Sequence, residues 1–105
     1  MIRTGWLIKR GRIRKNWKKR WFILKRDGTL SYHPSDVATK SVLGSVDLKA
    51  LQHVELAAPN SSRTAPTTFQ LRFPGRVLWL TADSIGSTTN WMDELKKFLN
   101  LNHLK

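Results

Sequence analysis

Residues 5–22 read GWLIKRGRIRKNWKKRWF, and this stretch decides both the expected fold and the expected ligand. From Arg10 to Trp21 it holds seven Lys or Arg residues in twelve positions and no acid, with Ile13, Trp17 and Trp21 among them. A solvated charge run has little use for tryptophan, and a buried strand cannot hold so many uncompensated cations. The stretch therefore predicts a surface hairpin that contacts an anionic partner.

The positive charge of the chain is concentrated in this region. The formal net charge is +12 over 105 residues, and the sequence pI is about 11.0. Ten of the nineteen basic residues lie between Lys9 and Arg26, and the first acid is Asp27. A hydrophobic fraction of 40% with five Trp indicates one globular domain, residues 1–105, with a modest core. A local basic patch favours nucleic acid, an anionic membrane or an acidic protein as partner.

Several kinds of site are not expected. The chain has no cysteine, which excludes disulfides, thiolate zinc sites and cysteine nucleophiles. No catalytic Ser–His–acid arrangement or glycine-rich phosphate loop is visible, so we expect neither an enzyme nor a cofactor. His33 and Asp36 could contribute to a metal site, but the place of His33 beside Tyr32 favours a pocket or surface histidine, and no metal is expected. His53 is expected on a strand surface.

The apolar segments are short and alternate with turn signals, a pattern typical of an antiparallel barrel or sandwich. No apolar run approaches the length of a membrane span, so we expect a soluble protein for which any membrane contact is peripheral. The absence of cysteine fits a cytoplasmic setting, and a monomer is expected. Asp27-Gly28 and Pro74-Gly75 are expected as hairpin turns, and residues 58–67 as the longest loop. The expected strands, within about residues 4–82, are Thr4–Arg10, Lys18–Lys25, Thr29–His33, Gly44–Leu48, His53–Ala57, Phe69–Phe73 and Val77–Ala82.

The last twenty residues change period and predict one helix over about residues 87–101. Apolar residues recur there at i, i+4, i+7 and i+8, which marks one helix face: Trp91, Leu95, Phe98 and Leu99. Ser87 or Thr88 is the expected N-cap. We expect this face to cover an open end or seam of the barrel, with Trp91 as its anchor.

A hairpin with residues 11–16 as its loop places Arg10 opposite Trp17 and Lys9 opposite Lys18. Because side chains alternate along a strand, Lys18 and Arg20 then share one face with Lys9, next to apolar residues deeper in the hairpin. Like charges opposite one another destabilise a strand pair, and no acid is close in sequence. The pattern therefore favours a ligand with several negative charges. The alternative is that these side chains simply extend into water.

This arrangement resembles a known family. Gly5-Trp6-Leu7-Ile8-Lys9, followed after a basic loop by Lys18-Lys19-Arg20-Trp21-Phe22, resembles the phosphoinositide-binding signature of pleckstrin homology domains. Trp91 matches the tryptophan of that family's closing helix. The resemblance covers residues 5 to about 101. It implies a seven-stranded, strongly bent antiparallel barrel capped by the C-terminal helix. The patterns themselves predict about seven strands, in a barrel or sandwich, followed by one amphipathic helix.

The resemblance also implies a lipid ligand and its site. The expected ligand is a 3-phosphorylated inositol lipid headgroup, phosphatidylinositol 3,4,5-trisphosphate or 3,4-bisphosphate. Lys9, Lys18 and Arg20 match the phosphate ligands of the motif, and Tyr32 matches a phosphate-contacting tyrosine. Leu43 falls near a place where the family often has a basic residue, which leaves room for the bisphosphate. The further expected headgroup ligands are Arg14 and Lys15 in the loop and Lys40, the cation nearest to Leu43.

The tip of the basic loop is expected to touch the membrane. An apolar Ile13 can enter the lipid interface while neighbouring cations such as Arg12 meet anionic headgroups. For Trp17 we expect packing against the strands of its own hairpin.

Two other function classes compete with this interpretation. Basic loops with aromatic residues suit single-stranded nucleic acid, but Trp6 and Trp21 fall where barrel packing can use them, so no nucleic acid is expected. The stronger alternative is a protein-interaction module, or a generic binder of anionic lipids, on the same fold.

Overall fold

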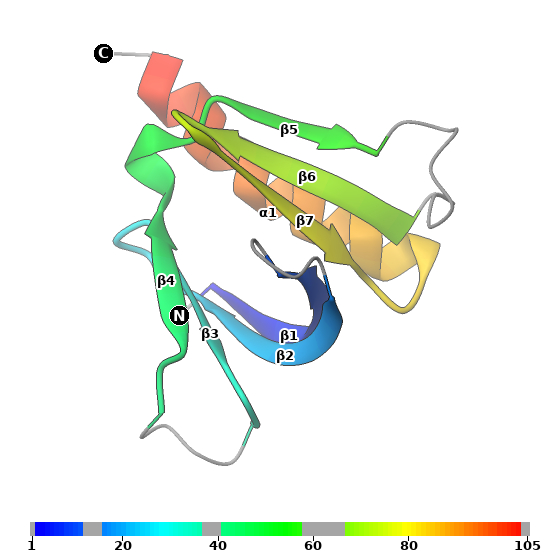
Figure 1. The fold of residues 1–105 in the computed structure, drawn as a ribbon. Coiled ribbons are helices and arrows are strands. Elements are labelled where there is room, and N and C mark those ends of the chain that lie inside the picture. Colours follow the sequence, from blue (N-terminus) through cyan, green and yellow to red (C-terminus); the bar gives the residue numbers. More distant parts are fainter. Residues whose placement is uncertain (1, 12–15, 37–40, 58–66, 104–105) are drawn as a thin grey trace.

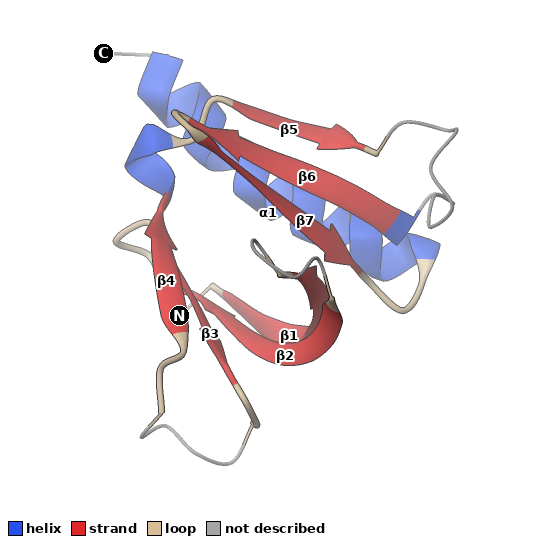
Figure 2. Ribbon diagram, in the orientation of Figure 1, coloured by secondary structure: helices blue, strands red, loops and turns tan. Residues whose placement is uncertain are grey.

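A computed structural model describes residues 2–11, 16–36, 41–57 and 67–103. The described residues form one seven-stranded antiparallel sheet, a short 3-10 helix and a C-terminal α-helix (Figure 1, Figure 2). Their bounds are β1 Arg3–Arg10, β2 Trp17–Leu24, β3 Thr29–His33, β4 Gly44–Asp47, η1 Leu48–Ala50, β5 His53–Leu56, β6 Thr68–Phe73, β7 Arg76–Thr81 and α1 Ile85–His103. The expected strands and helix are confirmed with ends shifted by one or two residues, and η1 was missed.

The sheet runs in the order β4-β3-β2-β1-β7-β6-β5. Figure 1 shows β1 and β2 strongly curved, and α1 lying against the part of the sheet formed by β5 to β7. The two hairpin turns contain glycines in the left-handed region, Gly28 at φ 93° and Gly75 at φ 72°, where other residues are strained. The bent, mainly β fold with a C-terminal helix is therefore confirmed.

Trp91 is the anchor of the helix, as predicted. Only 1% of its surface is exposed, and it packs on β1, where a Cβ added to Gly5 would lie 3.4 Å from its Cζ2. The Arg3 guanidinium lies 5.1 Å from the centre of the Trp91 ring. Gly5 therefore leaves the space that the ring fills. The rest of the core consists of inward-facing Leu and Phe of the sheet, with Leu95 of the helix.

The predicted N-cap of the helix was wrong by three or four residues. Helix α1 begins at Ile85, and Ser84 caps it: its Oγ accepts from the backbone N–H of Ser87 at 3.0 Å. Thr88, one of the two expected caps, lies inside the helix and donates its hydroxyl to the Ser84 carbonyl. At the other end, the Asn102 side-chain amide donates to the Leu48 carbonyl and so ties the helix to η1.

Trp6 and Trp21 do not contribute to the core. They are half-buried and pair across β1 and β2 on the outer face of the sheet, with ring centres 5.2 Å apart in an edge-to-face arrangement. The core is already filled by smaller side chains from the opposite face, such as Leu7 and Phe22. In the described part of the chain, no helix is long and apolar enough to cross a membrane.

Candidate functional site

The register of the β1–β2 hairpin is the predicted one. Lys9 lies opposite Lys18 and Arg10 opposite Trp17. Directly paired residues point to the same face, so Lys9, Lys18 and Arg20 project on the face that carries Leu7 and Phe22. The deeper part of that face closes the core, and the cations occupy its open end.

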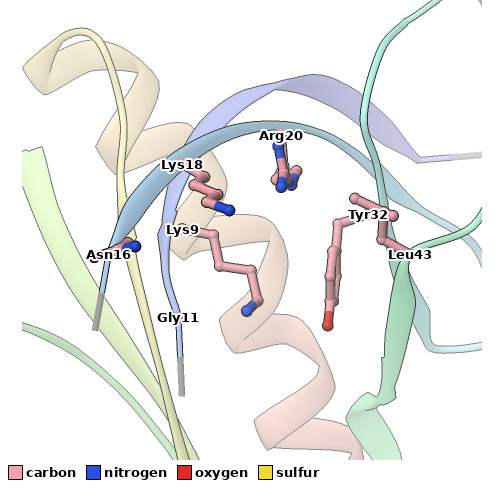
Figure 3. A pocket seen from close by; sticks show the side chains of 7 residues that line it. All are labelled: Lys9, Gly11, Asn16, Lys18, Arg20, Tyr32 and Leu43. Carbon is pink, nitrogen blue, oxygen red and sulfur yellow. The ribbon is translucent and has the colours of Figure 1, made fainter. Parts of the chain in front are cut away.

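These cations line a pocket of about 340 Å³ between the hairpin and the start of β4 (Figure 3). We call it the hairpin pocket. It is lined by Lys9, Gly11, Asn16, Lys18, Arg20, Tyr32 and Leu43. No acidic side chain belongs to this set, so the three cations face a space that suits an anion. The predicted grouping of Lys9, Lys18, Arg20 and Tyr32 is therefore present.

Tyr32 forms one wall of the hairpin pocket. The Lys9 ammonium lies 4.8 Å from the centre of its ring, which is a cation–π contact, and Figure 3 shows the two side chains beside each other. The ring also packs on Phe22, with ring centres 5.5 Å apart. Gly44, its cross-strand partner on β4, has no side chain, and a Cβ there would overlap the Tyr32 hydroxyl. The position of the ring thus depends on this glycine.

Arg20 is the least exposed of the three cations on β2. It is half-buried, whereas Lys18 is exposed. One guanidinium nitrogen of Arg20 donates to the Lys19 carbonyl at 3.0 Å. The remaining N–H groups of a guanidinium can donate to phosphate oxygens in a paired geometry. Together with the Lys9 and Lys18 ammonium groups and the Asn16 amide, they give a set of donors for a polyanion.

Some expected site residues lie outside the described residues. These are Arg14, Lys15 and Lys40 among the headgroup ligands, and Arg12 and Ile13 among the membrane contacts. Leu43 lines the hairpin pocket, in the place that its sequence position indicated. Gly11, Asn16 and Gly44 were missed as site residues. Asn16 could have been predicted from the sequence, because it is the last residue of the predicted loop and directly precedes β2.

The histidines form no metal-binding group in the described residues. His33 is buried rather than on the surface, and it lines a cavity on the opposite face of the sheet. Its Nε2 lies 3.0 Å from Ser31 Oγ, and its Nδ1 lies 2.9 Å from the Ser41 carbonyl. His53 is exposed on β5, as predicted. Within the described ranges, no group of three or more His, Asp or Glu could hold a metal ion.

Known proteins resemble this chain over almost its whole length. The sterol 3-beta-glucosyltransferase of Aspergillus fumigatus is 35% identical over 104 residues, which are 97% of this chain and 7% of that protein. The enzyme of Emericella nidulans is 30% identical over 105 residues, again 7% of its length. The chain thus spans about 7% of the length of these curated relatives.

Solved structures share the fold of this chain. The C-terminal PH domain of pleckstrin in complex with D-myo-Ins(1,2,3,5,6)P5 has a TM-score of 0.75 and 27% identity, covering 92% of this chain and 93% of that one. The PH domain of human pleckstrin homology domain-containing family A member 5 has a TM-score of 0.76 and 28% identity, covering 92% and 75%. Residues 1–100 also match the sequence profile of the PH domain. The chain therefore belongs to the PH domain family.

Proposed function

We propose that this domain binds the phosphorylated headgroup of an inositol lipid in the hairpin pocket and thereby holds its protein at a membrane. The observation that carries the proposal is the convergence of Lys9, Lys18 and Arg20 on a pocket whose described lining contains no acid. A hydrogen bond to a charged group contributes roughly 1.5–3 kcal/mol, so three cations can supply a substantial affinity. The pleckstrin domain, which is similar in fold and sequence, has been solved with two different inositol pentakisphosphates.

The finer part of the proposal concerns the phosphate pattern. We infer a 3-phosphorylated headgroup, because Tyr32 stands beside Lys9 at the pocket wall and matches the phosphate-contacting tyrosine of such binders. Leu43 occupies the rim near the start of β4, where its aliphatic side chain offers no charge to a further phosphate. This favours phosphatidylinositol 3,4-bisphosphate beside the 3,4,5-trisphosphate.

The relatives suggest a setting for such a domain. Sterol glucosyltransferases, by their name, act on sterols, which are membrane lipids. In a longer protein of that kind, a cytoplasmic headgroup-binding domain would bring the enzyme to its substrate. We propose a monomeric binding role for this domain and assign no catalytic step to it.

The test is a liposome titration across all phosphoinositide isomers with a matched pair of variants. Arg20→Ala removes a pocket cation, whereas Arg26→Ala removes an exposed one in the β2–β3 turn. We expect Arg20→Ala to abolish most binding and Arg26→Ala to change it little. Equal loss in both variants, with affinity following lipid charge alone, would identify a generic anionic-lipid binder. Absence of binding to every isomer would favour a protein-interaction module.

A further inference from the structure

The outer face of the β1–β2 hairpin carries a surface that the hairpin pocket does not explain. Four of the five tryptophans lie there with two cations, and we call this set the outer ladder: Trp6, Arg10, Trp17, Lys19, Trp21 and Trp79. The first five alternate along β1 and β2 with the inward-facing residues. Trp79 alternates in the same way with the buried Leu78 and Leu80 of β7. A sheet face this rich in tryptophan is unusual for a surface exposed only to water.

The side chains of the outer ladder hold one another in place. The Lys19 ammonium lies 4.7 Å from the centre of the Trp6 ring, which in turn meets Trp21 edge to face. The Arg10 guanidinium lies 5.6 Å from the centre of the Trp79 ring, and Arg10 is paired across the strands with Trp17. All four rings are half-buried. Such preorganised Trp and Arg side chains lose little entropy on binding, and these residue types dominate the energetics of protein interfaces.

A cavity of about 370 Å³ adjoins the outer ladder on the same face. Its lining includes Ile23, the next outward residue of β2 after Trp21, and His33, the cross-strand partner of Trp21. Val42 adds a second aliphatic wall, and Lys25 a cation. Hydroxyl groups of Thr29, Ser31 and Ser45 complete the described lining. The cavity can receive an aliphatic side chain and has a positive charge at its border.

The charges of this face indicate that its partner is negatively charged. Strands β1, β2 and β7 contain no Asp or Glu, and none lines the adjoining cavity among the described residues. Glu55 on β5, three strands away from β1 in the sheet, is already engaged by the Gln70 amide and by Arg72 at 3.7 Å. Lys19, Arg10 and Lys25 therefore present their charge outward, toward an anionic partner.

We propose that the outer ladder and the adjoining cavity bind an acidic segment of a partner protein. Carboxylates of that segment would meet Arg10, Lys19 and Lys25, and one of its aliphatic side chains would enter the cavity. A bilayer suits this face less well, because the half-buried rings offer only part of their surface for insertion between lipids. The face also lies on the side of the hairpin opposite to the hairpin pocket, so a lipid in that pocket leaves it accessible.

Two adjacent lysines allow a matched test. Lys18 and Lys19 are both exposed and lie on the same strand, but Lys18 faces the hairpin pocket and Lys19 the outer ladder. The probe is a pool of nine-residue peptides composed of Asp, Glu, Leu and Val, with a charge-inverted pool of Lys, Arg, Leu and Val as control. We expect Lys19→Glu to weaken binding of the acidic pool at least tenfold and to favour the basic pool. Lys18→Glu is expected to change peptide binding less than threefold.

The indole N–H signals in a two-dimensional NMR spectrum report the location of binding. The acidic pool should shift the signals of the four tryptophans of the outer ladder and leave that of the buried Trp91 in place. Equal loss of peptide binding in both lysine variants, no binding of the acidic pool, or shifts confined to the backbone amide signals of the hairpin pocket would overturn the proposal. It would also be overturned if only vesicles containing phosphatidylserine shifted the indole signals, since the face would then contact membrane. Headgroup binding by Lys18→Glu is measured separately, so failure of one proposal leaves the other testable.

Discussion

The substitution Gly44→Ala tests whether the wall of the hairpin pocket depends on a residue without a side chain. A Cβ at this position would overlap the Tyr32 hydroxyl and lie 3.1 Å from Tyr32 Cε1, so the ring must move. Gly44 has no positive φ, and alanine is therefore compatible with its backbone. The displaced atoms are the far end of a side chain, for which an off-rotamer shift costs about 1 kcal/mol. We expect the domain to stay folded with slightly lower stability.

The effect on ligand binding should be larger than the effect on folding. A displaced ring loses its contact with the Lys9 ammonium, now 4.8 Å from the ring centre, which is worth about 0.5–2 kcal/mol. A lost hydrogen bond from the Tyr32 hydroxyl to the ligand would add roughly 0.5–1.5 kcal/mol. A total of about 1–3.5 kcal/mol corresponds to an affinity weaker by about 5- to 300-fold.

Calorimetry with soluble inositol 1,3,4,5-tetrakisphosphate measures this loss, and Gly86→Ala is the matched control. A Cβ on Gly86 in helix α1 would meet no heavy atom within 4 Å, so its affinity should equal that of the wild type. In a Tyr32→Ala background, Gly44→Ala should have no further effect, because it acts only through the ring. Wild-type affinity of the single variant, or additive losses in the double variant, would refute the reasoning.

Three further predictions concern single side chains. Trp91→Ala should lower the free energy of unfolding by roughly 3–5 kcal/mol, and a wild-type melting temperature would contradict this. Ile13→Glu should weaken sedimentation with phosphoinositide liposomes while leaving calorimetric binding of the soluble headgroup unchanged; equal loss in both assays would make the side chain structural. The backbone N–H of Thr29 donates to the Asp27 carboxylate and lowers the pKa of that carboxyl. The ionised Asp27 therefore stabilises the fold above the ordinary Asp pKa, and this stabilisation is lost as the pH falls through the lowered pKa. The melting temperature of Asp27→Asn should therefore fall less at acid pH than that of the wild type. The same dependence of melting temperature on pH in both proteins would contradict this prediction.

Much of the fold and of the pocket followed from local patterns. The period of two along the hairpin, with the loop at residues 11–16, was enough to place Lys9 opposite Lys18 and to set Arg20 on the same face. The apolar period of the last helix singled out Trp91. These predictions succeeded because each depends only on residues close in sequence, on one hairpin or one helix.

The missed features depend on contacts between distant segments or on weak local signals. Gly44 matters because β3 and β4 pair in a register that places it opposite Tyr32, and the sequence between them does not fix that register. The hydrophobicity of Trp21 favoured a buried position. The core is instead filled by residues of the opposite face of the sheet, such as Leu7 and Phe22. The predicted helix start was wrong because Ser84, Ser87 and Thr88 are all residue types that cap helices well. The apolar pattern begins only at Trp91 and therefore does not distinguish among them.

The alternation of β2 explains why tryptophan and cations occur together in residues 10–21. Even-numbered residues such as Lys18 and Arg20 face the hairpin pocket, while the odd-numbered Trp17, Lys19 and Trp21 face outward. Each tryptophan therefore lies next in sequence to a pocket cation but on the opposite side of the sheet. The charge of the stretch does not belong to one site, because the strand divides it between two faces. Neutralising the same number of charges on either face should therefore impair different interactions, although the net charge of the domain changes equally.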